Sequence, residues 1–130
     1  MPWRCLIVDD NASFREEMRG LLVEQGLDVV GGAGSGAEAL QQIAELGPDV
    51  ALIDIDLGEE SGLELARRLG QRPGQAAVPH VILISTHAEA EYADLIEASS
   101  AIGFLAKIDV SAATIRQMLA AANGDRGDEP

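Results

Sequence analysis

Five short apolar runs alternate with helical patterns along the chain. The runs are "WRCLIV" (3–8), "LDVVGG" (27–32), "DVALID" (49–54), "HVILIS" (80–85) and "IGFLA" (102–106). Each run is nearly continuous in apolar residues, which is typical of strands that are buried on both faces of a sheet. The pattern therefore predicts five buried strands.

Between these runs, apolar residues recur at intervals of three and four, as they do on one face of a helix. The apolar sets are Phe14, Met18, Leu21 and Leu22; Ala37, Leu40, Ile43 and Ala44; Leu65, Ala66 and Leu69 within 61–69; Tyr92, Leu95, Ile96 and Ser99; and Ile115, Met118, Leu119 and Ala122. Glycines at 26, 47 and 70 stand where helices should end. Alternating strands and helices predict a doubly wound α/β fold, with a parallel sheet and helices on both faces.

The length and the apolar content indicate one packed domain. The chain has 130 residues, of which 47% are hydrophobic. We assign residues 1–123 to this domain. The end of the chain, "NGDRGDEP" (123–130), is polar and has no periodicity. Residues 124–130 are therefore expected to form a flexible tail or a truncated linker.

The charge balance and the single cysteine exclude several classes of function. The chain has 22 acidic and 9 basic residues, a net charge of −13, which argues against direct contact of this domain with nucleic acid. Cys5 stands alone, so no intrachain disulfide is possible, and its apolar surroundings predict a buried thiol. No apolar stretch is long enough to span a membrane, and the first residues lack a signal-peptide pattern. We expect a cytoplasmic protein without membrane contact.

Polar residues follow four of the five predicted strands. In a parallel sheet the carboxyl ends of the strands meet at one edge, where ligands bind. The residues at these ends are Asp9 and Asp10, Asp54 and Asp56, Ser85 and Thr86, and Lys107. Carboxylates that lie close together repel unless a cation neutralises them, and oxygen ligands of this kind suit Mg²⁺. The pattern predicts a Mg²⁺ site at this edge.

Lys107 adds a second requirement to this site. A site that binds only a metal ion does not need a lysine ammonium group. A site that also receives a phosphoryl group does, because the ammonium group and the metal ion together neutralise the phosphate oxygens. An aspartate in such a site can attack phosphorus and form an aspartyl phosphate. Asp54 is the best candidate, since it is the last residue of a central strand.

Four motifs in this order resemble the response-regulator receiver domain of two-component signalling. They are "LIVDDN" (6–11), "LIDIDLGEESG" (52–62), "LIST" (83–86) and "GFLAK" (103–107), and the resemblance spans residues 4–123. It implies a flavodoxin-like (βα)5 fold with the strand order 2-1-3-4-5.

The resemblance also implies a role for each matching position. Asp54 matches the phospho-acceptor, Asp10 the direct Mg²⁺ ligand and Asp9 its neighbour, which acts through water. The remaining matches are Asp56, whose backbone carbonyl completes the metal site; Lys107, which binds phosphate; Ser85, the switch hydroxyl; Phe104, the aromatic residue that changes rotamer; and Gly62, eight residues after the acceptor. Thr86 competes with Ser85 for the switch role, although the spacing to Lys107 favours Ser85.

The same resemblance implies partners and an output. A sensor histidine kinase or a phosphotransfer protein would supply the phosphoryl group, and the domain would catalyse only its own phosphotransfer and dephosphorylation. The switch would reshape the face built from the fourth helix, the fifth strand and the fifth helix, which is also the expected surface of a homodimer. Control of transcription through an attached or partner output domain is expected, and a stand-alone receiver remains an alternative.

Two departures and two alternatives qualify this interpretation. Gly58 stands where the family often has proline, which predicts a more mobile loop, and Ile108 replaces the proline that usually follows the lysine. One alternative is an interaction module that keeps the fold without phosphorylation. The other is a dinucleotide-binding enzyme, because "GGAGSGA" contains a G-x-G-x-x-A match, but it follows the second strand and leaves Asp9, Asp10, Ser85 and Lys107 unused.

Overall fold

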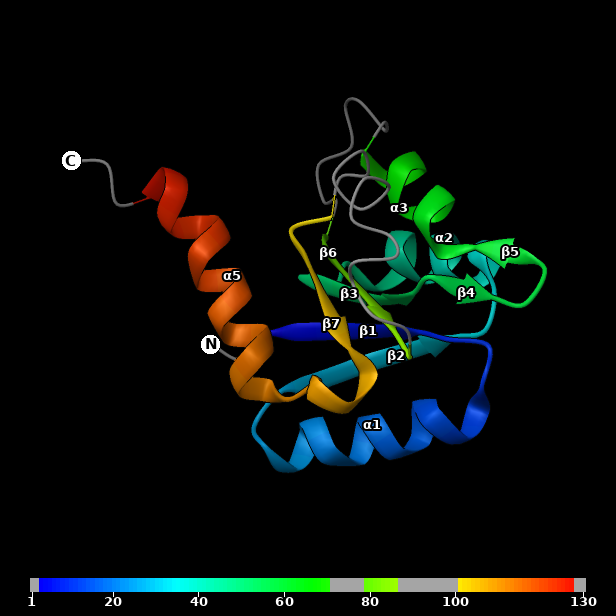
Figure 1. Cartoon of the computed structure of the whole chain (residues 1–130), viewed down its shortest axis with the longest axis horizontal. Coiled ribbons are helices and arrows are strands. Elements are labelled where there is room, and N and C mark those ends of the chain that lie inside the picture. Colours follow the sequence, from blue (N-terminus) through cyan, green and yellow to red (C-terminus); the bar gives the residue numbers. More distant parts are fainter. Residues whose placement is uncertain (1–2, 71–78, 87–100, 128–130) are drawn as a thin grey trace.

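The strands form one five-stranded parallel sheet (Figure 1). The computed structural model describes residues 3–70, 79–86 and 101–127. The strands of the sheet are β1 (Arg4–Val8), β2 (Asp28–Ala33), β3 (Val50–Asp54), β6 (His80–Ser85) and β7 (Gly103–Ala106). Their order is β2-β1-β3-β6-β7, and every neighbouring pair is parallel. The predicted flavodoxin-like order, 2-1-3-4-5 along the five strands, is confirmed.

Among the described residues, four α-helices cover the two faces of this sheet. They are α1 (Ala12–Glu24), α2 (Gly36–Leu46), α3 (Gly62–Gly70) and α5 (Ala112–Gly127), and the 3-10 helix η2 (Lys107–Asp109) precedes α5. Helices α1 and α5 pack on one face of the sheet, and α2 and α3 pack on the other (Figure 1). The helix predicted around Tyr92 and Ser99 lies outside the described residues.

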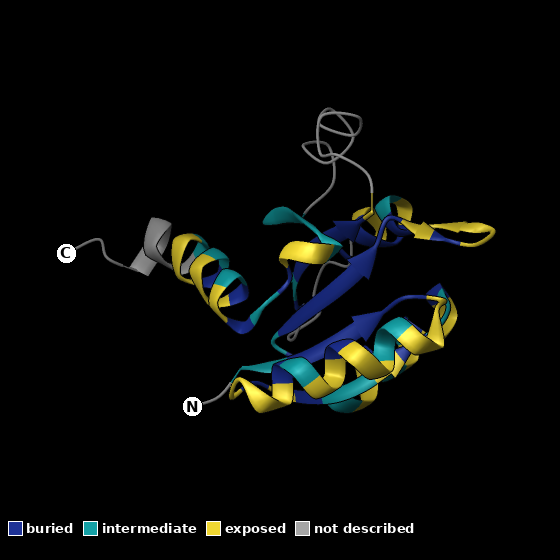
Figure 2. Ribbon diagram, turned by 60° about the horizontal axis from the view of Figure 1, so that its bottom comes forward, coloured by how far each residue is buried: buried dark blue, intermediate teal, exposed yellow. Residues whose placement is uncertain are grey.

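The core consists of two apolar layers, one on each face of the sheet. Successive strand residues point to opposite faces, so Leu6 packs in the layer with α2 and α3, whereas Ile7 packs in the layer with α1 and α5. All residues of β3 are buried, as are all but the first of β1 and β6, and the outer faces of the helices are exposed (Figure 2). The prediction of strands buried on both faces is therefore confirmed for β1, β3 and β6, whereas the edge strands β2 and β7 are only partly buried.

Cys5 lies in the second of these layers. Its side chain is fully buried, as predicted, and burial raises the pKa of the thiol to about 12. The thiol therefore stays protonated and packs as a small apolar group. Within the described part of the chain, no helix is long and apolar enough to cross a membrane.

Glycines end two of the helices as expected. Gly47 follows α2 in the left-handed conformation (φ 58°), and Gly26 follows the cap of α1 with φ 97°. The end of α1 also touches the start of α5, because the Gln25 side chain accepts a hydrogen bond from the Ala112 amide at 2.7 Å. This hydrogen bond therefore joins the C-terminal end of α1 to the N-terminal end of α5.

Two features differ from the sequence prediction. Residues 56–61 form a hairpin of two short strands, β4 (Asp56–Leu57) and β5 (Glu60–Ser61), where only a bending loop was expected. In addition, α5 continues through Gly127, so the expected boundary after Asn123 falls inside a helix. The polar composition of this last turn conceals the helix, because it has no apolar face to reveal the period.

Candidate functional site

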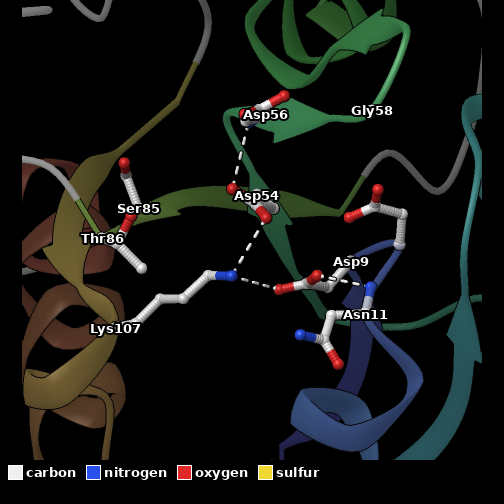
Figure 3. A pocket seen from close by; sticks show the side chains of 9 residues that line it. Asp9, Asn11, Asp54, Asp56, Gly58, Ser85, Thr86 and Lys107 are labelled. Atoms are coloured by element: carbon white, nitrogen blue, oxygen red, sulfur yellow. Dashed lines mark hydrogen bonds and ion pairs between the residues drawn. The ribbon is translucent and has the colours of Figure 1, made fainter.

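The polar residues at the carboxyl ends of the strands line one open cavity of about 200 Å³ (Figure 3). Its lining comprises Asp9, Asp10, Asn11, Asp54, Asp56, Gly58, Ser85, Thr86 and Lys107. Every strand-end residue predicted from the sequence is therefore in one place. The parallel sheet brings them together from positions up to 98 residues apart along the chain (9 to 107).

Asp9 and Asp10 follow β1 and have opposite environments. Asp9 is fully buried, and its Oδ1 accepts a hydrogen bond from the Asn11 amide at 2.9 Å. Its backbone carbonyl accepts a hydrogen bond from Arg15 Nη1 at 2.6 Å, which links it to the first turn of α1. Asp10 is exposed at the mouth of the cavity. The buried acid is thus fixed by the backbone, and the exposed acid faces solvent.

Asp54 ends β3 at the floor of the cavity. Only 5% of the residue is exposed, and its Oδ1 accepts a hydrogen bond from the Asp56 amide at 3.0 Å. Burial raises the pKa of the Asp54 carboxyl, and the charge of Asp9 adds to this, whereas the Asp56 amide and Lys107 lower it. The net shift is upward, so the ionised carboxylate is held at a cost in folding free energy.

Lys107 joins the two buried acids. Its Nζ lies 2.7 Å from Asp9 Oδ2 and 3.1 Å from Asp54 Oδ2, and 15% of its side chain is exposed (Figure 3). Burial lowers the pKa of the ammonium group, but the contacts with Asp9 and Asp54 outweigh this effect, so the pKa is raised. Lys107 therefore stays charged and offsets part of the acid repulsion.

Phe14 is a site residue that sequence reasoning did not identify. The Lys107 ammonium lies 4.4 Å from the centroid of its ring, which is within range of a cation–π contact. The helical spacing of apolar residues in α1 already explains Phe14 as a core residue. The sequence therefore gives no separate indication that Phe14 also lies at the site. Only the fold shows that the first turn of α1 faces the end of β7.

The donor atoms fit a hard divalent cation. One carboxylate oxygen from each of Asp9, Asp10 and Asp54 lies within 4.8 Å of the others. Asp9 Oδ2 is buried, and within the described residues it forms the ion pair with Lys107 but no hydrogen bond. An all-oxygen set with a mouth open to water is what Mg²⁺ requires, since it keeps several water ligands.

The predicted switch residues lie on the two strands beside this cluster. Ser85 is the last residue of β6 and is buried (2% exposed), whereas Thr86 follows it and is exposed. Phe104 is half-buried in β7 and packs against the core layer that α2 and α3 cover. Both hydroxyl residues line the cavity, so the geometry keeps both within reach of a ligand.

The return of the chain after the hairpin requires a glycine. The Gly62 amide donates to the Ile55 carbonyl at 2.7 Å, and a Cβ at position 62 would collide with the backbone carbonyl of Asp54. Gly62, which the motif singled out, is therefore explained by its close approach to the end of β3. Gly58 has φ 74°, and a Cβ there would lie 3.1 Å from Asp10 Oδ2.

The sequence matches the family model of the response regulator receiver domain over residues 5–120, which is most of the chain. The chain belongs to the response regulator receiver domain family. A solved relative agrees: the signal receiver domain of the putative response regulator NarL from Mycobacterium tuberculosis superimposes with a TM-score of 0.78 at 32% identity. The superposition covers 95% of this chain and 98% of that one.

Curated relatives of this receiver domain differ in the activities for which they are named. A protein-glutamate methylesterase/protein-glutamine glutaminase from Myxococcus xanthus is 40% identical over 68% of this chain and 25% of its own length. A putative transcriptional regulator from Pseudomonas aeruginosa is 34% identical over 80% of this chain and 49% of its own length. Chemotaxis protein CheY of Bacillus subtilis is 36% identical over 60% of this chain and 65% of its own length. The chain thus spans half or less of the first two relatives.

Family membership gives the general function. Receiver domains are signalling domains that interact with histidine kinases or phosphotransfer proteins. The dinucleotide-binding alternative is set aside by this assignment. The structure agrees, because the amide of Gly36, at the start of the helix after "GGAGSGA", already donates to the carboxylate of Glu60.

Proposed function

We propose that this receiver domain takes a phosphoryl group onto Asp54 from the phosphohistidine of a sensor kinase or of a phosphotransfer protein. The observation that carries this proposal is the position of the Asp54 carboxylate at the floor of an open cavity, 3.1 Å from the Lys107 ammonium. A carboxylate oxygen of Asp54 attacks phosphorus, the phosphorus–nitrogen bond breaks, and the imidazole leaves. The product is an acyl phosphate on Asp54.

Asp9, Asp10 and Asp54, with the backbone carbonyl of Asp56, would hold Mg²⁺. The three carboxylates supply oxygen donors within 4.8 Å of one another, which supports this assignment. When bound, the ion offsets negative charge on these acids and on the phosphoryl oxygens. Lys107 supplies the second positive charge, because its Nζ already bridges Asp9 and Asp54 and can move to a phosphoryl oxygen.

Ser85 and Phe104 would convert the new charge into a change of shape. The Ser85 hydroxyl binds the phosphoryl group, and its inward movement gives Phe104 room to turn into the core. Their placement on adjacent strands supports this proposal, since Ser85 pairs with Ala106 and Leu83 with Phe104. The switched surface then includes β7 and α5, and it is the proposed surface for a homodimer.

We also propose that the output is control of transcription, through an attached or partner domain. The similarity to the putative transcriptional regulator of Pseudomonas aeruginosa supports this proposal. Direct contact of this domain with nucleic acid is not expected, because its net charge is −13. DNA binding by the full gene product, compared before and after phosphorylation, tests the output separately.

The acceptor is tested by intact-mass measurement after incubation with a small phosphodonor and Mg²⁺. Wild type should gain one phosphoryl group, Asp54→Asn should gain none, and Asp56→Asn should keep the adduct because the backbone carbonyl of Asp56 is proposed as the ligand. An undiminished adduct in Asp54→Asn would overturn the proposal. Absence of any adduct, with equal partner affinity for wild type and Asp54→Ala, would favour the phosphorylation-independent module.

A further inference from the structure

The β4–β5 hairpin carries two residues of the cavity wall. Asp56 pairs with Ser61 and Leu57 pairs with Glu60, and a two-residue turn that begins with Gly58 connects the strands. Asp56 and Gly58 both line the cavity. The position of this hairpin therefore decides where the backbone of Asp56 lies relative to Asp54.

Two contacts fix the hairpin to the core at its base and on one strand. The Gly62 amide donates to the Ile55 carbonyl, and the side chain of Leu57 is buried in the layer that α2 and α3 cover. Glu60 and Ser61, on the returning strand, are exposed. This second strand is held through its pairing with β4, and a contact of its own with the rest of the molecule would fix it further.

Glu60 provides that contact across the chain. Its Oε1 accepts a hydrogen bond from the amide of Gly36, the first residue of α2, at 2.9 Å. The first amides of a helix lack partners within the helix, and this end of the helix favours negative charge. The Ser35 hydroxyl accepts a hydrogen bond from the Glu38 amide, and the Glu38 carboxylate accepts one from the Gly34 amide. Glu60 therefore adds an acceptor to the residues that cap the start of α2.

Gly36 leaves space for this contact because it has no side chain. A Cβ at position 36 would lie 2.6 Å from Glu60 Oε1, whereas its other nearest neighbour, Leu65 Cδ1, would lie at an ordinary 3.8 Å. The backbone of Gly36 does not require glycine, because positive φ among the described glycines occurs only at Gly26, Gly47 and Gly58. A side chain at position 36 would therefore push the Glu60 carboxylate away from the amide, whereas glycine leaves the contact open.

We propose that Glu60 is a positioning residue for the candidate metal site, because it ties the β4–β5 hairpin to the start of α2 and so holds Asp56 and Gly58 at the cavity. This inference rests on the proposed function for its consequence, which is a stronger metal site. Its structural part, an anchored hairpin, is independent of any chemistry at Asp54.

Amide hydrogen exchange of the metal-free protein in EDTA tests the anchor. Glu60→Ala removes the acceptor, and we expect the hairpin amides to exchange about tenfold faster than in wild type, as loss of one charge-assisted hydrogen bond implies. Glu59→Ala is the matched control, because it removes the same charge from the same turn. Equal exchange in the two variants would overturn the anchor.

A double-mutant cycle with Gly36→Ala tests whether the partner is the one named. Gly36→Ala alone should also speed hairpin exchange, since its methyl group displaces the Glu60 carboxylate. In the Glu60→Ala background the same change should have no further effect on the hairpin. Additive effects of the two substitutions would show that they act on different contacts.

Titration of the isotope-labelled protein with MgCl2, followed by NMR at the Asp56 and Gly58 amides, tests the consequence. We expect Glu60→Ala to bind Mg²⁺ several-fold more weakly than Glu59→Ala, at constant ionic strength. If wild type binds Mg²⁺ but gains no phosphoryl group, the proposed function fails while the positioning role stands. If the two variants bind Mg²⁺ equally while wild type is phosphorylated, the positioning role fails.

Discussion

Phe14 shows how one side chain can serve the core and the site at once. Its ring lies 4.4 Å from the Lys107 ammonium, which also contacts the two buried aspartates. A cation–π contact of this kind contributes about 0.5–1 kcal/mol at partly exposed sites. The ring therefore favours the observed position of the Lys107 ammonium beside Asp9 and Asp54.

Phe14→Leu should lower the initial rate of phosphorylation by a small phosphodonor about two- to fivefold, which corresponds to the loss of that contact. The rate is measured by intact mass against time. Phe14→Tyr is the control, because it keeps an aromatic face and should retain the wild-type rate. A leucine variant as fast as wild type would show that the ring does not position Lys107.

Asp54 makes the stability of the metal-free protein depend on pH. The pKa of its carboxyl is raised in the folded state, mainly by burial. The protonated carboxyl therefore favours the folded protein below the ordinary pKa of 3.8, and this contribution to stability is lost as the pH rises through the pKa of the folded state. Asp54→Asn removes the ionisable carboxyl group and with it this loss of stability at higher pH. In EDTA at pH 7 the variant should unfold at higher denaturant concentration than wild type, and the difference should shrink toward pH 4. A less stable variant at pH 7 would contradict the direction of the shift.

At the level of elements, the strands and helices were predictable because each buries a periodic apolar set. The β4–β5 hairpin was not, because strands of two residues are too short to show a period, and "DLGEES" is mostly polar. The positions of Asp9, Asp54 and Lys107 followed from strand ends alone. The contacts of Glu60 and Phe14 did not, since they depend on how α1 and α2 lie against the sheet.

Gly62 lies where the hairpin, α3 and the end of β3 come into close contact. Gly62→Ala should destabilise the protein by about 3 kcal/mol, because the new methyl group collides with the Asp54 carbonyl and the backbone must shift. Chemical denaturation measures the change. Gly20→Ala is the control: nothing lies within 4 Å of that position in α1, so alanine should stabilise the helix by about 0.5–1 kcal/mol. Equal effects of the two substitutions would refute the steric argument.

At the level of the whole molecule, we expect the acid cluster to couple metal binding to folding. Three carboxylates converge and one ammonium offsets them, so a bound cation stabilises the folded chain by mass action. The melting temperature of wild type should rise with MgCl2, and it should rise much less in Asp10→Asn. NaCl at matched ionic strength is the control, and an equal rise with either salt would show only general screening.

The ion pair of Asp9 with Lys107 also bears on the order in which the molecule assembles during synthesis. Asp9 emerges from the ribosome long before Lys107. The repulsion between the acids that follow β1 and end β3 is therefore not offset by the Lys107 ammonium group until β7 has been synthesised. Contacts so distant in sequence close late, after most of the sheet has formed. We therefore expect Lys107→Met to alter the rate of unfolding more than the rate of folding, which makes the signalling centre the last part of the domain to be completed.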